Sequence, residues 1–217
     1  MLCINGSEIS YSECEKLLGV VIDQNLSWDL QVDSVIKKCN SLLHLLSRIK
    51  IYLSRETRML FFNAYIFPHL DYCSIVWGDT SSTLVNRLTK FQKRAARMIL
   101  DADIDTPSAH LFSNLNWMVF PKRVEFHRSV QMYKIMNGFS PTYLRDLFTF
   151  TSDIHSRSLR STSEKLLYTP KPTFELYRKS LSYSGSVMWN SIPDPIRQAY
   201  SIKELKKKLC KNYLGFN

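Results

Sequence analysis

The chain has 217 residues, 45% of them hydrophobic and 12% aromatic, which supports a buried core and excludes wholesale disorder. Its 29 Lys and Arg outnumber 19 Asp and Glu, and the net charge of +10 favours a polyanionic partner, either nucleic acid or an acidic membrane surface. On charge alone, a basic surface without a specific partner is the alternative.

Targeting and redox patterns point to the cell interior. The start has no basic region followed by an apolar one, and no run of about twenty apolar residues could span a bilayer. The 5 cysteines are scattered without a Cys-x-x-Cys pair, as is usual for reduced thiols. We therefore expect an intracellular protein, nuclear or cytoplasmic, without membrane contact.

The β pattern lies in the first 26 residues. Asn5-Gly6 separates two short runs, 2–4 and 7–9, and tolerates the positive φ angles of a type I′ hairpin turn. Residues 17–22 (LLGVVI) are apolar and rich in β-branched side chains, which predicts one buried strand. A sheet this small needs other elements to cover it.

Two long amphipathic helices are predicted further along. Apolar residues over 28–49 recur at steps of four and three, with Ser27 or Asp29 as the cap. Residues 83–100 repeat this pattern with a second apolar seam.

Between them, a helix is predicted over 55–67 that is apolar almost all round. We expect it to be central and buried on every side, with Pro68 ending or kinking it. Trp28 and Trp117 lie in apolar stripes and are expected in the core, whereas Trp77 and Trp189 adjoin loops and remain candidates for stacking on bases.

Beyond a break at 101–107, the pattern changes to shorter helices. They are expected around residues 108–115, 122–136 and 141–148, and ordered structure is expected again over 174–181 and 186–189. Residues 149–172 are rich in Ser and Thr and predict a long polar loop. Ser201 and Glu204 match a capping box that starts a closing helix. The fold class is therefore mainly α, with a small N-terminal β-hairpin.

Basic residues gather on the helix predicted over 83–100. Four of them share one face, about 100° around the helix from its apolar seam, and a fifth adjoins them. The four, here called the basic stripe, are Arg87, Lys90, Arg94 and Arg97, and the fifth is Lys93. No acid is interleaved with them, so they repel one another unless an anion such as a phosphate backbone runs past. A solvated face opposite a packed seam is the alternative.

The closing helix carries a second basic run. Lys206 and Lys207 are further candidates for nucleic-acid contact, with a nuclear import signal or a solvated face as alternatives.

No residue pattern supports a metal, cofactor or catalytic site. Residues 101–105 (DADID) begin like a calcium loop, but Thr106 and Phe112 stand where that loop needs Gly and Glu. His69 and Cys73 are half of a zinc pair without a second half. Nucleophile elbows, triads and glycine-rich phosphate loops are lacking. We expect no cofactor, no metal and no small-molecule substrate.

Several segments carry a family resemblance. They are residues 17–28 (LLGVVIDQNLSW), 68–78 (PHLDYCSIVWG), 88–99 (LTKFQKRAARMI), 189–193 (WNSIP), Ile196-Arg197, and Ser201 with its lysine-rich helix. In order and spacing, across nearly the whole chain, they resemble the reverse transcriptases of jockey-like non-LTR retrotransposons, which are RNA-directed DNA polymerases of mobile elements.

The resemblance implies a division of the chain and of the work. Residues 1–26 would be a palm-remnant hairpin and strand, 27–106 a thumb-like helical bundle, and 107–217 a C-terminal helical extension with a polar loop near 149–172. In the family, palm aspartates hold the magnesium ions of nucleotidyl transfer and the thumb holds the primer–template duplex. This chain has no Asp-Asp dipeptide, and the motif would lie upstream of Met1.

We therefore expect a non-catalytic C-terminal fragment of a reverse transcriptase. It would bind RNA or RNA–DNA duplex through the basic thumb helix, with a palm supplied in trans as a further partner. The alternatives are a helical protein–protein scaffold, with the 28–49 stripe partly exposed, and a functionless relic of a mobile element.

Overall fold

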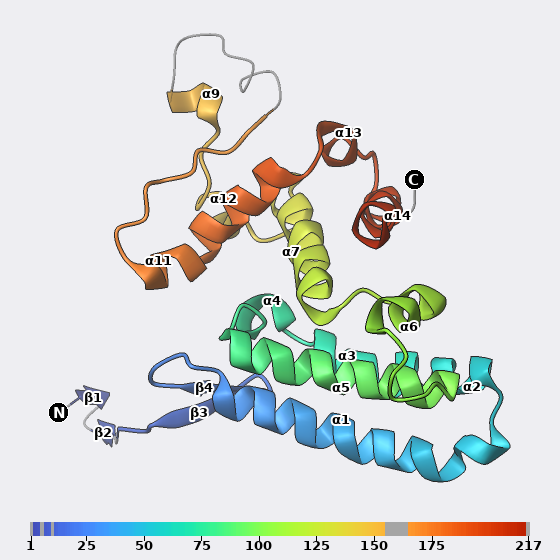
Figure 1. Ribbon diagram of the computed structural model, residues 1–217. Helices are drawn as coiled ribbons and strands as arrows, with labels where there is room; N and C mark the ends of the chain where they lie inside the picture. Colours follow the sequence, from blue (N-terminus) through green and yellow to red (C-terminus); the bar gives the residue numbers. More distant parts are fainter. Residues whose placement is uncertain (1, 5–6, 10, 155–164, 216–217) are drawn as a thin grey trace. The chain divides into compact units, whose positions relative to one another are not determined.

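The computed structural model describes residues 2–4, 7–9, 11–154 and 165–215 (Figure 1). Helices dominate it and short antiparallel strands lie at the N-terminal end, which confirms the mainly α class with a small N-terminal β-hairpin. The chain divides into two compact units, Met1–Leu115 and Asn116–Asn217. The division falls inside the extension predicted from residue 107.

The N-terminal strands form two hairpins. Strand β1 (Leu2–Ile4) pairs with β2 (Ser7–Ile9) as predicted, while the Asn5-Gly6 turn lies outside the described residues. The single strand predicted over 17–22 is wrong, because β3 (Cys14–Leu17) turns back into β4 (Val20–Asp23). Leu18 and Gly19 both have positive φ, 47° and 85°, which is the geometry of a two-residue hairpin turn.

Asp23 fixes the entry to helix α1 (Asp29–Ile49). Its carboxylate accepts hydrogen bonds from the backbone N–H groups of Asn25 (3.0 Å), Ser27 (3.1 Å) and Trp28 (3.0 Å). These bonds lower the pKa of Asp23. Trp28 is the N-cap residue, in the left-handed region, so the prediction of Asp29 as the cap is wrong. The Ser27 hydroxyl accepts a long hydrogen bond (3.4 Å) from the Asp29 N–H, the first of the helix.

The apolar segment that follows α1 is a helix broken by a wider turn. A 3-10 turn (Lys50–Tyr52) leads into α2 (Arg55–Phe61), a π-helical turn (Phe62–Ile66), α3 (Phe67–Asp71) and α4 (Ser74–Trp77). The break precedes Pro68, which has no N–H to continue the α-helical pattern.

Burial of this segment is one-sided, so the prediction of a helix buried all round is wrong. Phe62 and Ile66 are fully buried, but Leu60 and Tyr65 are 64% and 58% exposed. The neighbouring helices cover only one face.

Helices α5 (Ser82–Leu100) and α6 (Ser108–Leu115) complete the first unit. The core of this unit lies between α1, the π-helical turn, α3 and α5. Its largest fully buried side chains are Trp77, Phe62, Leu46, Ile66, Leu70, Leu88, Ile99 and Leu111.

The second unit is built around α7 (Phe120–Met136), against which α12 (Leu181–Ser191) and α14 (Ile202–Leu214) pack. Its shorter helices are α8 (Thr142–Arg145), α9 (Thr151–Ile154), α11 (Glu175–Lys179) and α13 (Asp194–Arg197). Met132, Trp189, Leu205 and Leu209 lie in one buried cluster.

The polar loop predicted over 149–172 is partly ordered where the structure describes it. It begins with α9, and Phe150 bridges to Leu167. The Asn190 side chain accepts from the Leu167 N–H (2.9 Å) and donates to its carbonyl (2.8 Å). Residues 155–164 lie outside the described part.

The two tryptophans kept as stacking candidates are structural. Trp77 is fully buried and donates to the Tyr72 carbonyl (2.8 Å), and Trp189, 5% exposed, donates to the Lys165 carbonyl (3.1 Å). Both hold neighbouring chain in place and are not available to bases.

Candidate nucleic-acid interface

Helix α5 presents the predicted stripe because its apolar seam is firmly seated. The Ser81 hydroxyl caps the start by accepting from the Leu84 N–H (3.4 Å), and Asp101 ends the helix in the left-handed region. Along the seam, the side chains Leu84, Leu88, Phe91, Ala95 and Ile99 are buried. This burial fixes the rotation of the helix and so the direction of its cations.

The five predicted cations of α5 differ in exposure. Arg87, Lys90 and Arg94 are exposed, whereas Lys93 and Arg97 are half-buried. The buried Nε of Arg97 has no hydrogen-bond partner within the described chain. Lys90 forms no ion pair or hydrogen bond with any residue that the structure describes. Lys90 is therefore the cation of the stripe most open to an external anion.

Helix α1 runs parallel to α5 and supplies partners for part of the stripe. Arg87 pairs with Asp33, and Arg94 donates to Asn40. Both pairs are 54 residues apart in sequence, so the two helices run in the same direction (Figure 1). No acid is interleaved with the stripe on α5 itself, but Asp33 of α1 neutralises Arg87 from the neighbouring helix.

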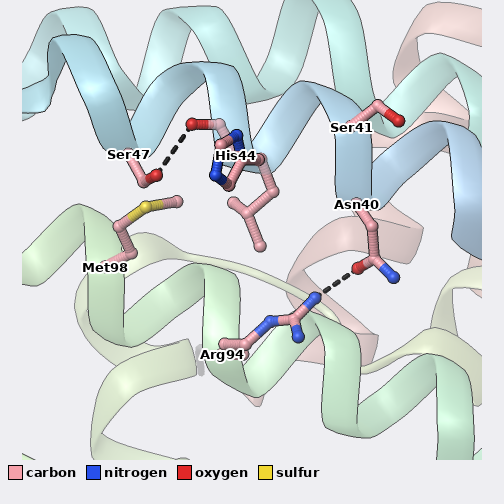
Figure 2. A pocket seen from close by; sticks show the side chains of 7 residues that line it. Asn40, Ser41, His44, Ser47, Arg94 and Met98 are labelled. Carbon is pink, nitrogen blue, oxygen red and sulfur yellow. Dashed lines mark hydrogen bonds between the residues drawn. The ribbon is translucent and has the colours of Figure 1, made fainter.

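A hollow opens between the two helices next to Arg94 (Figure 2). Its volume is about 690 Å³ and we call it the α1–α5 groove. It is lined by Asn40, Ser41, Leu43, His44, Ser47, Arg94 and Met98. Figure 2 shows Arg94 reaching from α5 toward Asn40, while the Ser47 hydroxyl bonds to the His44 carbonyl (2.7 Å).

The chemistry of the α1–α5 groove suits phosphate. A guanidinium presents a planar set of donors that matches phosphate oxygens, and the amide and hydroxyl groups beside it are common contacts to phosphate and sugar. Lys37 lies on the same face of α1, between Asp33 and Asn40 by helical spacing, and is exposed. Around the groove, the positive charges of Arg94 and Lys37 therefore outnumber the single negative charge of Asp33.

Two cations from outside α5, Lys50 and Arg58, have a structural role at its C-terminal end. Asp101 pairs with Lys50 (3.0 Å) and with Arg58, whose guanidinium also donates to the Ile99 carbonyl (3.3 Å). The Arg58 hydrogen bond, followed by that of Lys50, lowers the pKa of Asp101. This cluster ties the start of α2 to the end of α5. It places residue 101 in the polar turn that the sequence predicted for 101–107.

Lys206 and Lys207 lie on α14, in the second unit, and both are exposed. They belong to a different compact unit from the basic stripe. Each surface is therefore a separate candidate.

Comparison with protein-family models, with curated proteins and with solved structures finds no match. The resemblance to reverse transcriptases rests on the sequence segments and stays a prediction.

Within the described ranges, no three His, Cys, Asp or Glu side chains gather to hold a metal ion. Burial raises the pKa of the Cys39 thiol to about 12, which keeps it protonated and unreactive. In the same part of the chain, no helix is both long and apolar enough to cross a bilayer.

Sequence reasoning missed the α1 side of the site. Asp33, Lys37, Asn40 and His44 recur at steps of four and three, which is a visible polar face on a predicted helix. That pattern does not say which helix lies beside it. Only the tertiary packing of α1 on α5 makes it half of a groove.

Proposed function

We propose that this chain is a nucleic-acid-binding helical module related to the thumb of a non-LTR retrotransposon reverse transcriptase. It binds the phosphate backbone of RNA–DNA or RNA duplex along α5 and the α1–α5 groove. It performs no polymerisation itself, because in the resembled family that chemistry belongs to palm aspartates outside the matching segments.

The observation that carries the proposal is the pairing of a basic helix with a hollow of matching chemistry. Arg94 lines the hollow and is held by Asn40, so its remaining donors are oriented before a ligand arrives. Lys90, one turn earlier, is exposed and unpaired among the described residues. A backbone lying along α5 would contact both side chains in succession.

The test is fluorescence anisotropy with a labelled RNA–DNA hybrid, titrated with salt. Lys37→Ala and Lys90→Ala are each expected to weaken binding several-fold and to reduce the slope of log K against log salt by about 1. Lys38→Ala is the matched control, because Lys38 is exposed and lies about 100° further round α1, away from α5.

Equal losses in Lys37→Ala and Lys38→Ala would mean that net charge, not this groove, attracts the duplex. Template-directed incorporation of deoxynucleotides by the purified chain would overturn the non-catalytic part of the proposal.

A protein partner is the second candidate. It is favoured by the exposed apolar side of α2 and the π-helical turn that follows it, here together called the α2 segment. Leu60 and Tyr65 are exposed there, and so are Ile51 (73%) and Tyr52 (82%) just before it. A solution mass that stays monomeric, with no binding of a hydrophobic dye, would count against this reading. If the Leu60→Asp variant still binds the RNA–DNA hybrid, this apolar surface is separate from the nucleic-acid site.

A further inference from the structure

Helix α14 begins with a capping arrangement that fixes the residue before it. The Ser201 hydroxyl accepts from the Glu204 N–H (3.2 Å), and the Glu204 carboxylate accepts from the Tyr200 N–H (2.8 Å). The backbone of Tyr200 is thus held, yet its ring is 89% exposed. The Tyr200 ring therefore projects into solvent from a backbone position that a hydrogen bond holds in place.

The lysines of α14 fall into two classes. Lys208 is neutralised by its own helix, since it pairs with Glu204 (2.8 Å), and it also donates to the Pro195 carbonyl (2.9 Å). Three others, spaced four residues apart and exposed, have no partner among the described residues. These three, here called the lysine ridge, are Lys203, Lys207 and Lys211.

The lysine ridge and Tyr200 border the same hollow. This second hollow has a volume of about 600 Å³ and is lined by Tyr200, Ser201, Lys203, Glu204, Lys207, Lys208 and Lys211. Neighbouring ridge lysines are separated by roughly 6 Å along the helix axis. That step is on the order of the spacing of successive phosphates in an extended strand.

We propose that this surface of the second unit is a single-stranded nucleic-acid site. The lysine ridge follows the phosphates, and Tyr200 stacks on one base at the end of the hollow, the combination that single-strand-binding proteins use. The site goes beyond the duplex-binding function and stands without it, because it lies in the other compact unit.

The packing of α14 favours nucleic acid over a lipid surface. A helix that lies in a membrane interface buries its apolar face in the acyl region. Here Leu205 and Leu209, which form that face, are 0% and 1% exposed because they pack into the core of the unit. The outward face therefore offers charge and one ring without an apolar wedge.

The test uses the full chain and a labelled single-stranded oligouridylate of about twelve nucleotides, within the range that such sites cover. Lys207→Ala is expected to weaken binding several-fold and to lower the salt slope by about 0.7. Lys206 was predicted from the sequence together with Lys207, but only Lys207 lines the hollow. Lys206→Ala is therefore the matched control, because Lys206 is also exposed and lies about 100° around the helix from Lys207.

Tyr200 has a separate readout from the lysines. Tyr200→Ala should lose on the order of tenfold in affinity with no change in salt slope, and Tyr200→Phe should keep wild-type affinity, because stacking needs only the ring. Lys90→Ala, on the first unit, should leave oligouridylate binding unchanged, which separates failure of this site from failure of the duplex site.

Three results would overturn the proposal. They are no binding of the oligonucleotide at low salt, equal losses in Lys206→Ala and Lys207→Ala, and full affinity in Tyr200→Ala. Binding to vesicles of anionic phospholipid with the same lysine dependence, but not to the oligonucleotide, would assign the surface to membranes instead.

Discussion

Asp33 neutralises one cation of the basic stripe, so it links the contact between α1 and α5 to the proposed binding of nucleic acid. It pairs with Arg87 across the α1–α5 boundary, at side-chain exposures of 54% and 42%, and would repel a phosphate arriving there. Exposed pairs of this kind contribute little stability, about 0.2–1 kcal/mol. Asp33→Asn should therefore cost little in stability while freeing Arg87 for a ligand.

We predict that Asp33→Asn binds RNA–DNA hybrid more tightly than the wild type and with a steeper salt dependence, by up to about 0.9 in slope. Anisotropy titrations at several salt concentrations measure both quantities. Unchanged or weaker binding would show that Arg87 serves the α1–α5 contact alone.

Asp101 is the residue whose charge should matter for stability. Hydrogen bonds from Arg58 and then Lys50 hold its pKa below the usual value, so the charged form is favoured in the folded state. A lowered folded-state pKa stabilises the protein above the unfolded-state pKa of about 3.8–3.9, and the effect is lost as the pH falls through the folded-state value. The side chain is 52% exposed, so the contribution is discounted for solvent screening.

Asp101→Asn is expected to lower the free energy of unfolding by about 1 kcal/mol or less at pH 7. Asparagine tolerates the left-handed φ of 48° at this position, so the substitution isolates the charge. Urea unfolding at neutral and acid pH should show the difference shrinking below about pH 3.8. A difference that is the same at both pH values would assign the loss to geometry.

At the scale of elements, the contact of α12 with α7 depends on Gly185. A Cβ placed there would lie 2.7 Å from the Met132 sulfur and 3.1 Å from two ring carbons of Phe148. The methionine can move, but the ring is packed in the core, so the added methyl group overfills the contact.

Gly185→Ala is predicted to destabilise the chain by about 1–2 kcal/mol, although alanine is the better helix former by about 1 kcal/mol. Thermal or urea unfolding measures the change. Val187→Ala, on the exposed side of the same helix, serves as control and should change stability by about 0.5 kcal/mol or less. A stabilised Gly185→Ala would show that α12 does not pack as described.

The sequence predicted those elements whose pattern is local. The Ser201 capping box, the β1–β2 pairing and the seam of α5 all follow from residues within a few positions of one another. The hairpin at Leu18-Gly19 was missed because β-branched neighbours outweighed a single glycine.

Features that depend on contacts between distant parts of the chain could not be predicted from the sequence. The apolar content of the α2 segment predicted burial on every side, but only tertiary packing decides how many faces are covered. Similarly, nothing in the stripe itself shows that Asp33 and Asn40 stand opposite it, 54 residues away.

At the scale of the whole molecule, the two compact units each hold a core and a separate basic surface. The first unit carries the α1–α5 groove and the second carries the lysine ridge with Tyr200. Units with their own cores are expected to fold separately.

We predict that residues 1–115 and 116–217, expressed as separate chains, are each helical by circular dichroism and unfold cooperatively. The first should bind hybrid duplex and the second oligouridylate. Loss of helix in either half would mean that its core is incomplete without the other.

The central claim is that the cations of α5 hold a nucleic-acid backbone. The most direct measurement is the salt dependence of hybrid binding for the wild type and for the quadruple variant Arg87→Ala, Lys90→Ala, Arg94→Ala, Arg97→Ala. We predict steep salt dependence in the wild type and a slope smaller by roughly 2 to 4 in the variant, as phosphate contacts are removed. Equal slopes in two folded proteins, or no binding by the wild type at low salt, would contradict the claim and leave the stripe as a solvated surface.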